Sequence, residues 1–331
     1  MNVAVLGAGS WGTTVASLTA SRNRTTLWAR DQDVMEEINT EHLNTKYLKG
    51  YPLPATLRST TDLSAAVAMA DVVIVGIPSH DFRSVLEQCA PHIRPWIPVV
   101  SLTKGFERGT VMRMTEIIKD VLPGHPAAAL TGPNLAKEIM AGYAAGAVVA
   151  TEDLSVARAL QAVFHRSFFR TYTNHDVLGC EVAGALKNVI AIAAGMAEGL
   201  SVGDNTRAAV VSRGLSELAR LGTAMGGHAS TFSGLAGLGD LMATCMSPQS
   251  RNRYVGEQLG KGRKLPEILA EMNMVAEGVK TAETVMVLAE RHSIAMPICR
   301  TVYRVLEGEI DAAAAYAGLL QVRPGHEDDP D

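Results

Sequence analysis

A glycine-rich turn between an apolar run and a helical pattern limits what this 331-residue chain can fold into more than any other feature. The run NVAVLG (2–7) is typical of a buried strand, and helical spacing follows over 11–21. Between them, Gly7, Gly9 and Gly12 show the spacing GxGxxG. Glycines there allow a tight turn and let the backbone approach a pyrophosphate, which the N-terminus of the helix binds through its N–H groups and dipole. The stretch predicts a dinucleotide site, and a glycine turn with a structural role alone is the alternative.

Short apolar runs alternate with helical patterns through the first half of the chain. Further strands are predicted at 25–29, 71–78, 97–103, 127–133 and 146–151, with a last, edge strand at 168–174, and helices at 80–90, 109–121 and 153–166. Strands that alternate with helices are typical of a doubly wound, mostly parallel α/β sheet. Residues 1–178 are therefore predicted to form one such domain.

The composition changes after about residue 178, where Ala, Gly, Leu and Met dominate and helical spacing persists to about residue 320. We expect an all-helical domain over 179–320, with a long helix at its start in EVAGALKNVIAIAAGMAEGL (181–200). The tail 321–331 is acidic, contains Pro and Gly and lacks apolar anchors, so it is predicted to be disordered.

Lys187 is the one cation in this apolar helix. A lone lysine in an apolar stretch usually extends its amine to solvent at the edge of the helix. The alternative is functional, because the segment lies at the junction of two domains, where pockets tend to form. Apolar surroundings and a second cation such as Lys104 would then lower the pKa of Lys187 toward the range of a useful base, while a close Asp240 would oppose this and orient the amine instead.

Several function classes are disfavoured by the bulk sequence. A net charge of −4 argues against sequence-independent nucleic-acid binding, which needs a basic face. The four cysteines form no CxxC pair and the nine histidines no HExxH motif, so neither a disulfide framework, a zinc site nor another metal site is predicted. The N-terminus has no signal-peptide pattern, and no uninterrupted apolar run reaches the length of a membrane span. A cytoplasmic protein without stable membrane insertion is expected.

Candidate ligand residues follow the predicted strands, because ligands of doubly wound sheets bind beyond the carboxyl ends of the strands. Arg30 would pair with a 2′-phosphate and favours NADP, whereas the adjacent Asp31 leaves NAD, or use of both cofactors, open. Lys104 follows the strand predicted at 97–103, and the turn TGPN (131–134) would present backbone N–H groups and Asn134. An exposed lysine and an ordinary tight turn are the alternatives.

Three stretches of the second half carry polar residues in a helical context. Asp240 lies in a glycine-dense segment, GLAGLGDLMATC (234–245), which predicts a tight loop in which Asp240 either meets a ligand or caps the next helix. SRNR (250–253) places Ser, Arg and Asn at a helix start, which forms either an anion site or a capped surface helix. Glu277 is either a ligand contact or a charge near the positive end of a helix.

The motifs GAGSWGTTVA, LTKGFE, LTGPNLAKEI, EVAGALKNVIAIAAG, GLGDLMATC, QSRNRYVGEQLG and VAEGVKTA occur in this order. Together they resemble the bacterial NAD(P)-dependent glycerol-3-phosphate dehydrogenases, from Asn2 to about residue 310. The resemblance implies an N-terminal Rossmann domain and a C-terminal domain like that of 6-phosphogluconate dehydrogenase. It also implies interconversion of sn-glycerol 3-phosphate and dihydroxyacetone phosphate, a small phosphorylated three-carbon substrate, in support of phospholipid synthesis.

The resemblance also assigns site residues. It implies proton transfer by Lys187, with Lys104 and Asp240 as further catalytic residues. The substrate residues would be Lys104, Gly132, Asn134, Lys187, Asp240, Ser250, Arg251 and Asn252. The NAD(P) residues would be Gly7, Gly9, Ser10, Trp11, Gly12, Arg30, Lys104, Ala136, Arg251, Val275 and Glu277. Asn134 departs from the Ser or Thr that is usual there, and Arg30 occupies a variable position.

Two other functions compete with this one. A dehydrogenase of the same superfamily that acts on a β-hydroxy acid would also place a lysine on the interdomain helix, but the SRNR and GLGDL stretches favour the glycerol phosphate function. A catalytically inactive dinucleotide-binding regulator would need Gly7, Gly9 and Gly12 without Lys104, Lys187 and Asp240. The sequence does not determine the oligomeric state and leaves a homodimer open.

Overall fold

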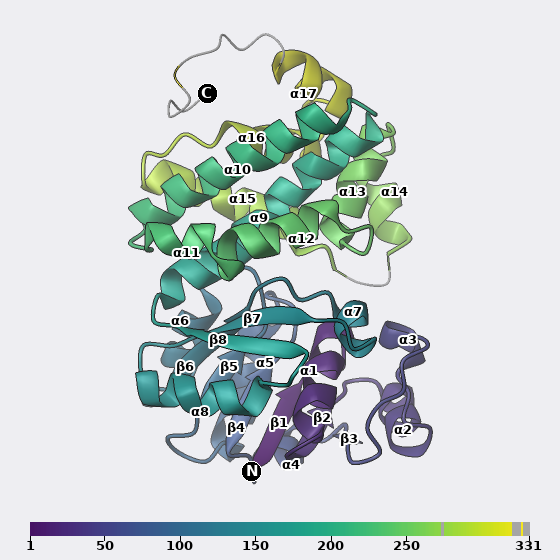
Figure 1. The fold of residues 1–331 in the computed structure, drawn as a ribbon, viewed down its shortest axis with the longest axis vertical. Helices are drawn as coiled ribbons and strands as arrows, with labels where there is room; N and C mark the ends of the chain where they lie inside the picture. Colours follow the sequence, from purple (N-terminus) through teal and green to yellow (C-terminus); the bar gives the residue numbers. More distant parts are fainter. Residues whose placement is uncertain (273–274, 320–325, 327–331) are drawn as a thin grey trace. The chain divides into compact units, whose positions relative to one another are not determined.

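The computed structural model describes residues 1–272, 275–319 and 326 (Figure 1). Contacts between Cα atoms divide the chain into two units. The first comprises Met1–Glu107 and Met112–Val177, and the second comprises Arg108–Val111 and the chain from Leu178 onward. The acidic tail predicted to be disordered, 321–331, lies outside the described residues apart from His326.

The first unit is built on an eight-stranded sheet in the order β3-β2-β1-β4-β5-β6-β7-β8. The strands from β1 to β6 run parallel, β7 is antiparallel to β6, and β8 is parallel to β7. This confirms the predicted doubly wound, mostly parallel sheet and its edge strand at 168–174. The strands are β1 (Asn2–Leu6), β2 (Arg24–Trp28), β3 (Arg58–Thr60), β4 (Val72–Val75), β5 (Val99–Ser101), β6 (Ala127–Thr131), β7 (Ala145–Ala150) and β8 (Phe169–Asn174).

Both faces of the sheet are covered, which explains why its central strands are continuously apolar rather than alternating. Val3 and Val5 of β1 join one core, with α1, α2, α7 and α8, while Ala4 and Leu6 join the other, with α4, α5 and α6. The helices of this unit are α1 (Ser10–Ala20), α2 (Gln32–Thr40), α3 (Thr45–Leu48), α4 (Leu63–Val67), α5 (Phe82–Cys89), η1 (Ala90–His92), α6 (Met114–Val121), α7 (Ala136–Met140) and α8 (Leu154–Phe164).

The helix predicted at 109–121 begins only at Met114, so this expectation was wrong over its first turn. Gly109 and Val111 adopt positive φ angles of 86° and 63°, which no α-helix accommodates. The helix starts after Arg113, where the side chain of Glu116 accepts a hydrogen bond from the Arg113 N–H and forms a capping box. Capping, rather than apolar spacing, therefore decides where α6 begins.

The second unit is helical within the part of the chain that the structure describes. Its helices are α9 (Val177–Gly199), α10 (Asp204–Ala224), α11 (Ala229–Ser233), the π-helical η2 (Leu235–Gly239), α12 (Asp240–Met246), α13 (Arg251–Gly260), α14 (Leu265–Ala270), α15 (Glu277–Arg291), α16 (Pro297–Leu306) and α17 (Ala312–Leu319). The segment 234–239 is thus mostly helical, and the predicted loop was wrong. Gly237 is required there by packing, since a Cβ would lie 2.1 Å from the carbonyl oxygen of Phe232.

The long helix predicted from 181–200 is confirmed as α9, which runs through the middle of the helical unit (Figure 1). By length and composition this 23-residue helix is apolar enough to cross a membrane, although Glu181 and Lys187 interrupt its apolar run. However, 89% of its most apolar window is buried inside the structure, as in the core helix of a soluble protein. Its hydrophobicity is therefore accounted for by packing.

Helices α9 and α13 pack with their backbones in contact. A Cβ on Gly195 of α9 would lie 2.1 Å from the carbonyl oxygen of Arg253, and one on Gly256 of α13 would lie 2.0 Å from that of Ile192. Gly199 and Gly260 show equally close approaches further along the two helices. Small residues at these four positions permit this approach, and any side chain would force the helices apart.

We predict that Glu217→Ala destabilises the protein by about 2–4 kcal/mol, because it removes the acceptor of two N–H groups at the start of α16, one of them buried. The carboxylate of Glu217, on α10, is almost fully buried and accepts hydrogen bonds from the backbone N–H groups of Ile298 (2.6 Å) and Cys299 (3.1 Å) at the start of α16. Denaturant unfolding measures the loss. The exposed Glu290→Ala serves as the control, with an expected change below about 0.5 kcal/mol.

The same carboxylate carries a pH dependence. Burial raises the pKa of Glu217, so its protonated form is favoured in the folded state. The contribution of this group to the free energy of unfolding is therefore greatest at low pH and falls as the pH rises through its raised folded-state pKa. In Glu217→Gln the free energy of unfolding should lack this decline. Equal slopes of unfolding free energy against pH in the two proteins would contradict the assignment.

Candidate active site

The glycine-rich turn joins β1 to α1, and each of its glycines has a different reason to be glycine. Gly7 has φ +112°, and a Cβ there would lie 2.5 Å from the carbonyl oxygen of Gly76. A Cβ on Gly12 would lie 1.9 Å from the carbonyl oxygen of Gly7. Gly9 has an ordinary φ of −68°, and its Cβ would meet no protein atom within 4 Å. Nothing in the fold requires glycine at position 9, and the open space there fits a ligand that lies against the protein backbone.

The turn continues into the N-terminus of α1, which begins at Ser10 after Gly9 as N-cap, without a capping side chain. An uncapped N-terminus directs N–H groups and a positive dipole end toward an anion. The hydroxyl of Ser10 donates to the carbonyl oxygen of Tyr47 (2.7 Å), and the ring of Trp11 packs at a tilt against Phe169, 6.3 Å between centroids. The side chains of both residues therefore contact protein.

Arg30 and Asp31 at the end of β2 have different roles. Asp31 is the N-cap of α2, where its carboxylate accepts from the N–H of Asp33 (3.0 Å) and pairs with Lys46 (2.7 Å). The hydrogen bond from Lys46 and that from Asp33 lower the pKa of Asp31. The side chain of Arg30 is 84% exposed, with Asp81 at 3.7 Å. Asp31 is thus used in capping, whereas Arg30 extends its charge into solvent.

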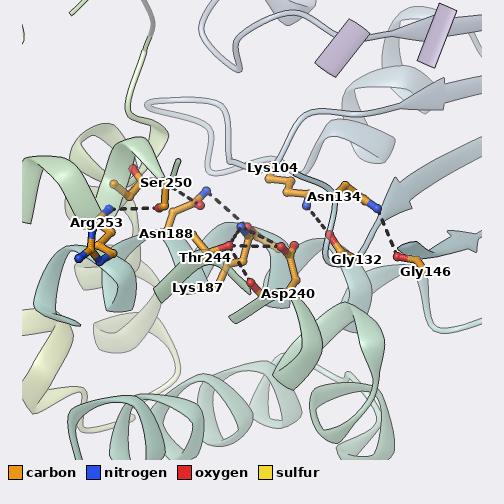
Figure 2. A network of polar contacts seen from close by, with 12 residues as sticks. Lys104, Gly132, Asn134, Gly146, Lys187, Asn188, Asp240, Thr244, Ser250 and Arg253 are labelled. Atoms are coloured by element: carbon orange, nitrogen blue, oxygen red, sulfur yellow. Dashed lines mark hydrogen bonds and ion pairs between the residues drawn. The ribbon is translucent and has the colours of Figure 1, made fainter. Parts of the chain in front are cut away.

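The residues predicted after β5 and β6 lie close together (Figure 2). The amine of Lys104 donates to the carbonyl oxygen of Gly132 (2.9 Å). Gly132 has φ +116°, and the amide of Asn134 donates to the carbonyl oxygen of Gly146 in β7 (3.3 Å). The Oδ1 atom of Asn134 is buried without a hydrogen-bond partner. Ala136 follows as the first residue of α7, so the two loops and α7 lie at the carboxyl end of the parallel strands.

In the helical unit, Lys187 of α9 is only 5% exposed, which rules out the alternative of a lysine that extends to solvent at the helix edge. Its amine lies 3.0 Å from Oδ1 of Asp240, which is 2% exposed, and donates to Oγ1 of Thr244 (2.6 Å; Figure 2). The N-cap of α12 is Gly239, so the alternative that Asp240 caps this helix was also wrong. A buried ammonium and a buried carboxylate compensate each other here, because either one alone would be costly to bury.

Two polar residues of this site were missed from the sequence. Thr244 lies four residues after Asp240, a spacing that puts both on one face of α12, and its hydroxyl lies 2.7 Å from the carbonyl oxygen of Asp240. Asn188 accepts a hydrogen bond from the amide of Asn252 (2.9 Å), whose own oxygen accepts from the N–H of Gly278 (2.9 Å). Asn252 therefore joins α9, α13 and α15, and the D-x-x-x-T spacing was the signal that could have indicated Thr244.

The start of α13 combines a cap with a cation. Ser250 is the predicted cap, and its hydroxyl accepts from the N–H of Arg253 (3.2 Å). The guanidinium of Arg251 donates to the carbonyl oxygen of Val275 (2.6 Å), two residues before Glu277 begins α15. This contact brings together two of the residues predicted to meet the cofactor.

The second arginine of the SRNR stretch is used differently. Arg253 is mostly buried and pairs with Glu257 (3.3 Å) and Glu198 (3.7 Å), which ties α13 to α9. Arg251, by comparison, is the exposed arginine of this stretch.

A cavity of about 750 Å³ lies elsewhere, at the amino ends of β1 and β2, where Asn2, Arg22, Arg24 and Asp71 line it. None of the predicted site residues borders this cavity. Ligands of doubly wound sheets bind at the opposite, carboxyl end, so the cavity is separate from the candidate site. Over residues 1–272, 275–319 and 326, no group of three His, Cys, Asp or Glu side chains is arranged to hold a metal ion.

Two family models match the chain, the N-terminus of NAD-dependent glycerol-3-phosphate dehydrogenase over residues 2–157 and the C-terminus of the same family over 176–317. "Glycerol-3-phosphate dehydrogenase [NAD(P)+] 2" of Sphingopyxis alaskensis is 58% identical over 330 residues, 100% of this chain and 99% of that protein. The chain belongs to the NAD-dependent glycerol-3-phosphate dehydrogenase family. The resemblance seen in its seven motifs is thereby confirmed.

Other members of this dehydrogenase family agree in sequence and fold. "Glycerol-3-phosphate dehydrogenase [NAD(P)+]" of Mycobacterium avium is 53% identical over 326 residues, 98% of this chain and 96% of that protein. The crystal structure of glycerol-3-phosphate dehydrogenase from Coxiella burnetii matches with a TM-score of 0.93 and 36% identity, covering 97% of this chain and 99% of that chain. The predicted combination of a Rossmann domain and a helical domain is confirmed by these matches.

Gly9 and Gly12 provide a matched pair of variants that separates the ligand from the fold. Gly9→Ala should retain the stability of the wild type, because its methyl group meets no protein atom, but should weaken NADH and NADPH binding about tenfold or more by excluding the pyrophosphate. Gly12→Ala should instead destabilise the fold by a few kcal/mol, because its methyl group would overlap the backbone at Gly7. Thermal unfolding and fluorescence titration of the cofactor measure the two effects, and unchanged cofactor affinity in Gly9→Ala would contradict the predicted dinucleotide site at this turn.

Proposed function

We propose that this chain is an NAD(P)-dependent sn-glycerol-3-phosphate dehydrogenase that interconverts sn-glycerol 3-phosphate and dihydroxyacetone phosphate. The observation that carries the proposal is the buried amine of Lys187, held between Asp240 and Thr244 in a chain of this family. Family membership favours this function over a β-hydroxy acid dehydrogenase. The presence of Lys187 and Asp240 as a buried pair favours it over an inactive regulator, which has no need of one. We place the enzyme in the cytoplasm, where its product would serve phospholipid synthesis, and propose a homodimer.

The dinucleotide would be held by Gly7, Gly9, Gly12 and the N-terminus of α1, with Arg30, Ala136, Val275 and Glu277 as further contacts. When bound, NAD(P)H supplies the hydride that reduces C2 of the ketone. The open space at Gly9 is the observation of this structure that fits such a ligand.

Lys187 is the proposed proton donor and acceptor at the oxygen on C2. In reduction its ammonium donates a proton to this oxygen as C2 gains a hydrogen, so the carbonyl becomes an alcohol. In oxidation the neutral amine accepts the hydroxyl proton as C2 loses its hydrogen. An ammonium carries three donors, and Asp240 and Thr244 are in contact with two of them. Their contacts orient the amine so that the third donor is directed at the substrate.

The remaining residues would position the substrate. Arg251, with Ser250 and Asn252 at the start of α13, is the proposed phosphate site, because guanidinium groups and helix N-termini both favour such an anion. Arg253 is not assigned to it, since its charge is compensated by Glu198 and Glu257. Lys104, Gly132 and Asn134 would contact the three-carbon body. Binding the phosphate away from C2 would align the reacting carbon for hydride transfer.

We propose a preference for NADPH over NADH. The carboxylate of Asp31, which would favour the 2′-hydroxyl of NADH, is used in capping α2 and in pairing with Lys46. The exposed guanidinium of Arg30 at the same strand end is suited to a 2′-phosphate.

Dihydroxyacetone phosphate reduction, assayed in parallel with NADH and NADPH, tests the function and the preference together. We expect turnover with both cofactors and a higher kcat/KM with NADPH, which Arg30→Ala should lower by about tenfold for NADPH while sparing NADH. A panel with unphosphorylated dihydroxyacetone and a β-keto acid serves as the control. Cofactor binding without turnover of any of these substrates would contradict the proposal.

For the amine itself, we predict that Lys187→Met lowers kcat by about 10²–10⁴-fold, the usual contribution of a proton-transfer group, while NADPH still binds. Steady-state assays of dihydroxyacetone phosphate reduction give kcat, and fluorescence titration gives the affinity for NADPH. Normal turnover would remove Lys187 from the mechanism.

This variant removes the buried cation beside the carboxylate of Asp240, and breaking a buried ion pair in this way destabilises a protein by about 3–5 kcal/mol. Lys187→Met/Asp240→Asn removes both charges and should restore much of the stability. It should remain inactive, which separates the loss of chemistry from the loss of fold.

A further inference from the structure

The loop that carries Lys104 runs from the end of β5 to Glu107 and is held at its near end by Thr103. The hydroxyl of Thr103 donates to the carbonyl oxygen of Ile77 (2.6 Å), and its N–H donates to the hydroxyl of Ser101 (3.1 Å). Between Thr103 and Glu107 only Lys104, a glycine and the buried Phe106 remain. A displacement at either end of so short a loop therefore moves Lys104.

The far end is held by Arg83, which projects from α5. Its Nε donates to Oε1 of Glu107 (2.7 Å) and its Nη2 to Oε2 (3.1 Å). This is the bidentate geometry in which arginine recognises a carboxylate most strongly. The side chains are 26% and 15% exposed, so the pair is screened far less than a surface ion pair. The guanidinium also contacts the carboxylate of Asp120 on α6 and Sδ of Met112 (3.3 Å).

The backbone turn beyond Glu107 is strained and depends on contacts that hold it in place. The chain turns back here, so that the N–H of Glu107 donates to the carbonyl oxygen of Met112 (2.9 Å). Phe106 forms an antiparallel β-bridge with Arg113. Within this turn Val111 has φ +63°, an unfavourable conformation for a β-branched residue. Strained backbone of this kind persists only where surrounding contacts hold it. The guanidinium of Arg83 contacts both ends of the turn, at Glu107 and Met112.

We infer that Arg83 is a positioning residue for Lys104, which it holds in place through the carboxylate of Glu107. The inference rests on the proposed function, in which Lys104 contacts substrate. Arg83 itself bonds to none of the residues proposed to touch substrate or cofactor, so it would act only by fixing the loop. The amine of Lys104 is then kept at the carbonyl oxygen of Gly132, the arrangement seen in the structure.

The test compares steady-state kinetics of Arg83→Met with those of Arg94→Met. Arg94 lies in the same unit and pairs with Asp71, but this ion pair is more exposed and lies at the amino end of β4. Arg83→Met should lower kcat/KM for dihydroxyacetone phosphate by about 10–100-fold, the cost of a misplacement near 1 Å, while KM for NADPH stays within about twofold. Arg94→Met should leave both values unchanged.

Glu107→Gln and Arg83→Lys keep the inference testable if Arg83→Met folds poorly. Each should also lower kcat/KM for dihydroxyacetone phosphate, as Arg83→Met does. The double variant Arg83→Met/Glu107→Gln should lose no more than the worse single variant, because both act through one contact. Unchanged kcat/KM in a folded Arg83→Met, or additive losses in the double variant, would overturn the inference.

Lys104→Met separates this inference from the function on which it rests. A large loss of kcat/KM in Lys104→Met with none in Arg83→Met would refute positioning by Arg83 and leave the function standing. Full activity in Lys104→Met would remove Lys104 from the proposed site. Absence of turnover in the wild type would refute the function itself.

Discussion

The buried ion pair between Lys187 and Asp240 constrains the helical unit more than any other interaction. Helix α9 is enclosed on nearly all sides, so an ammonium in its middle can reach no solvent and must be met by another element. Helix α12 meets it with a carboxylate and a hydroxyl four residues apart, at 3.0 and 2.6 Å. The place of α12 against α9 is thus set by a charge as well as by apolar packing. The same burial makes the amine a directed group rather than a mobile surface lysine.

Close backbone packing determines what lies beside this pair. Because glycines let α13 approach α9 to backbone contact, Asn252 at the start of α13 reaches Asn188, the neighbour of Lys187. The N–H of Gly278 completes the link to α15. In this way one stripe of glycines fixes the start of α13, with Arg251, relative to the amine. Glycine serves the first unit differently, since Gly7 and Gly12 allow the turn to close and Gly9 leaves its outer side open.

In the first unit the parallel sheet gathers the loops, and side chains then set their geometry. The carboxyl ends of β1, β2, β5 and β6 share one edge, which places the glycine-rich turn, Arg30, Lys104 and Gly132 there by topology alone. The distance between Lys104 and Gly132 depends instead on how the loop after β5 is held, and Arg83 and Thr103 hold it from opposite ends.

Local patterns in the sequence determined the parts of this protein that depend on near neighbours along the chain. The GxGxxG turn, the alternation of strands and helices, the long apolar helix α9 and the Ser250 cap all follow from spacings of a few residues. The short, polar β3, the start of α6 and the helical η2 were not predictable in this way, because capping and backbone packing override apolar spacing there. The site depended on tertiary structure still more. Lys187 meets Thr244 across 57 residues and Asn188 meets Asn252 across 64, and only the folded chain decides that a lysine typical of a helix edge is buried beside a carboxylate.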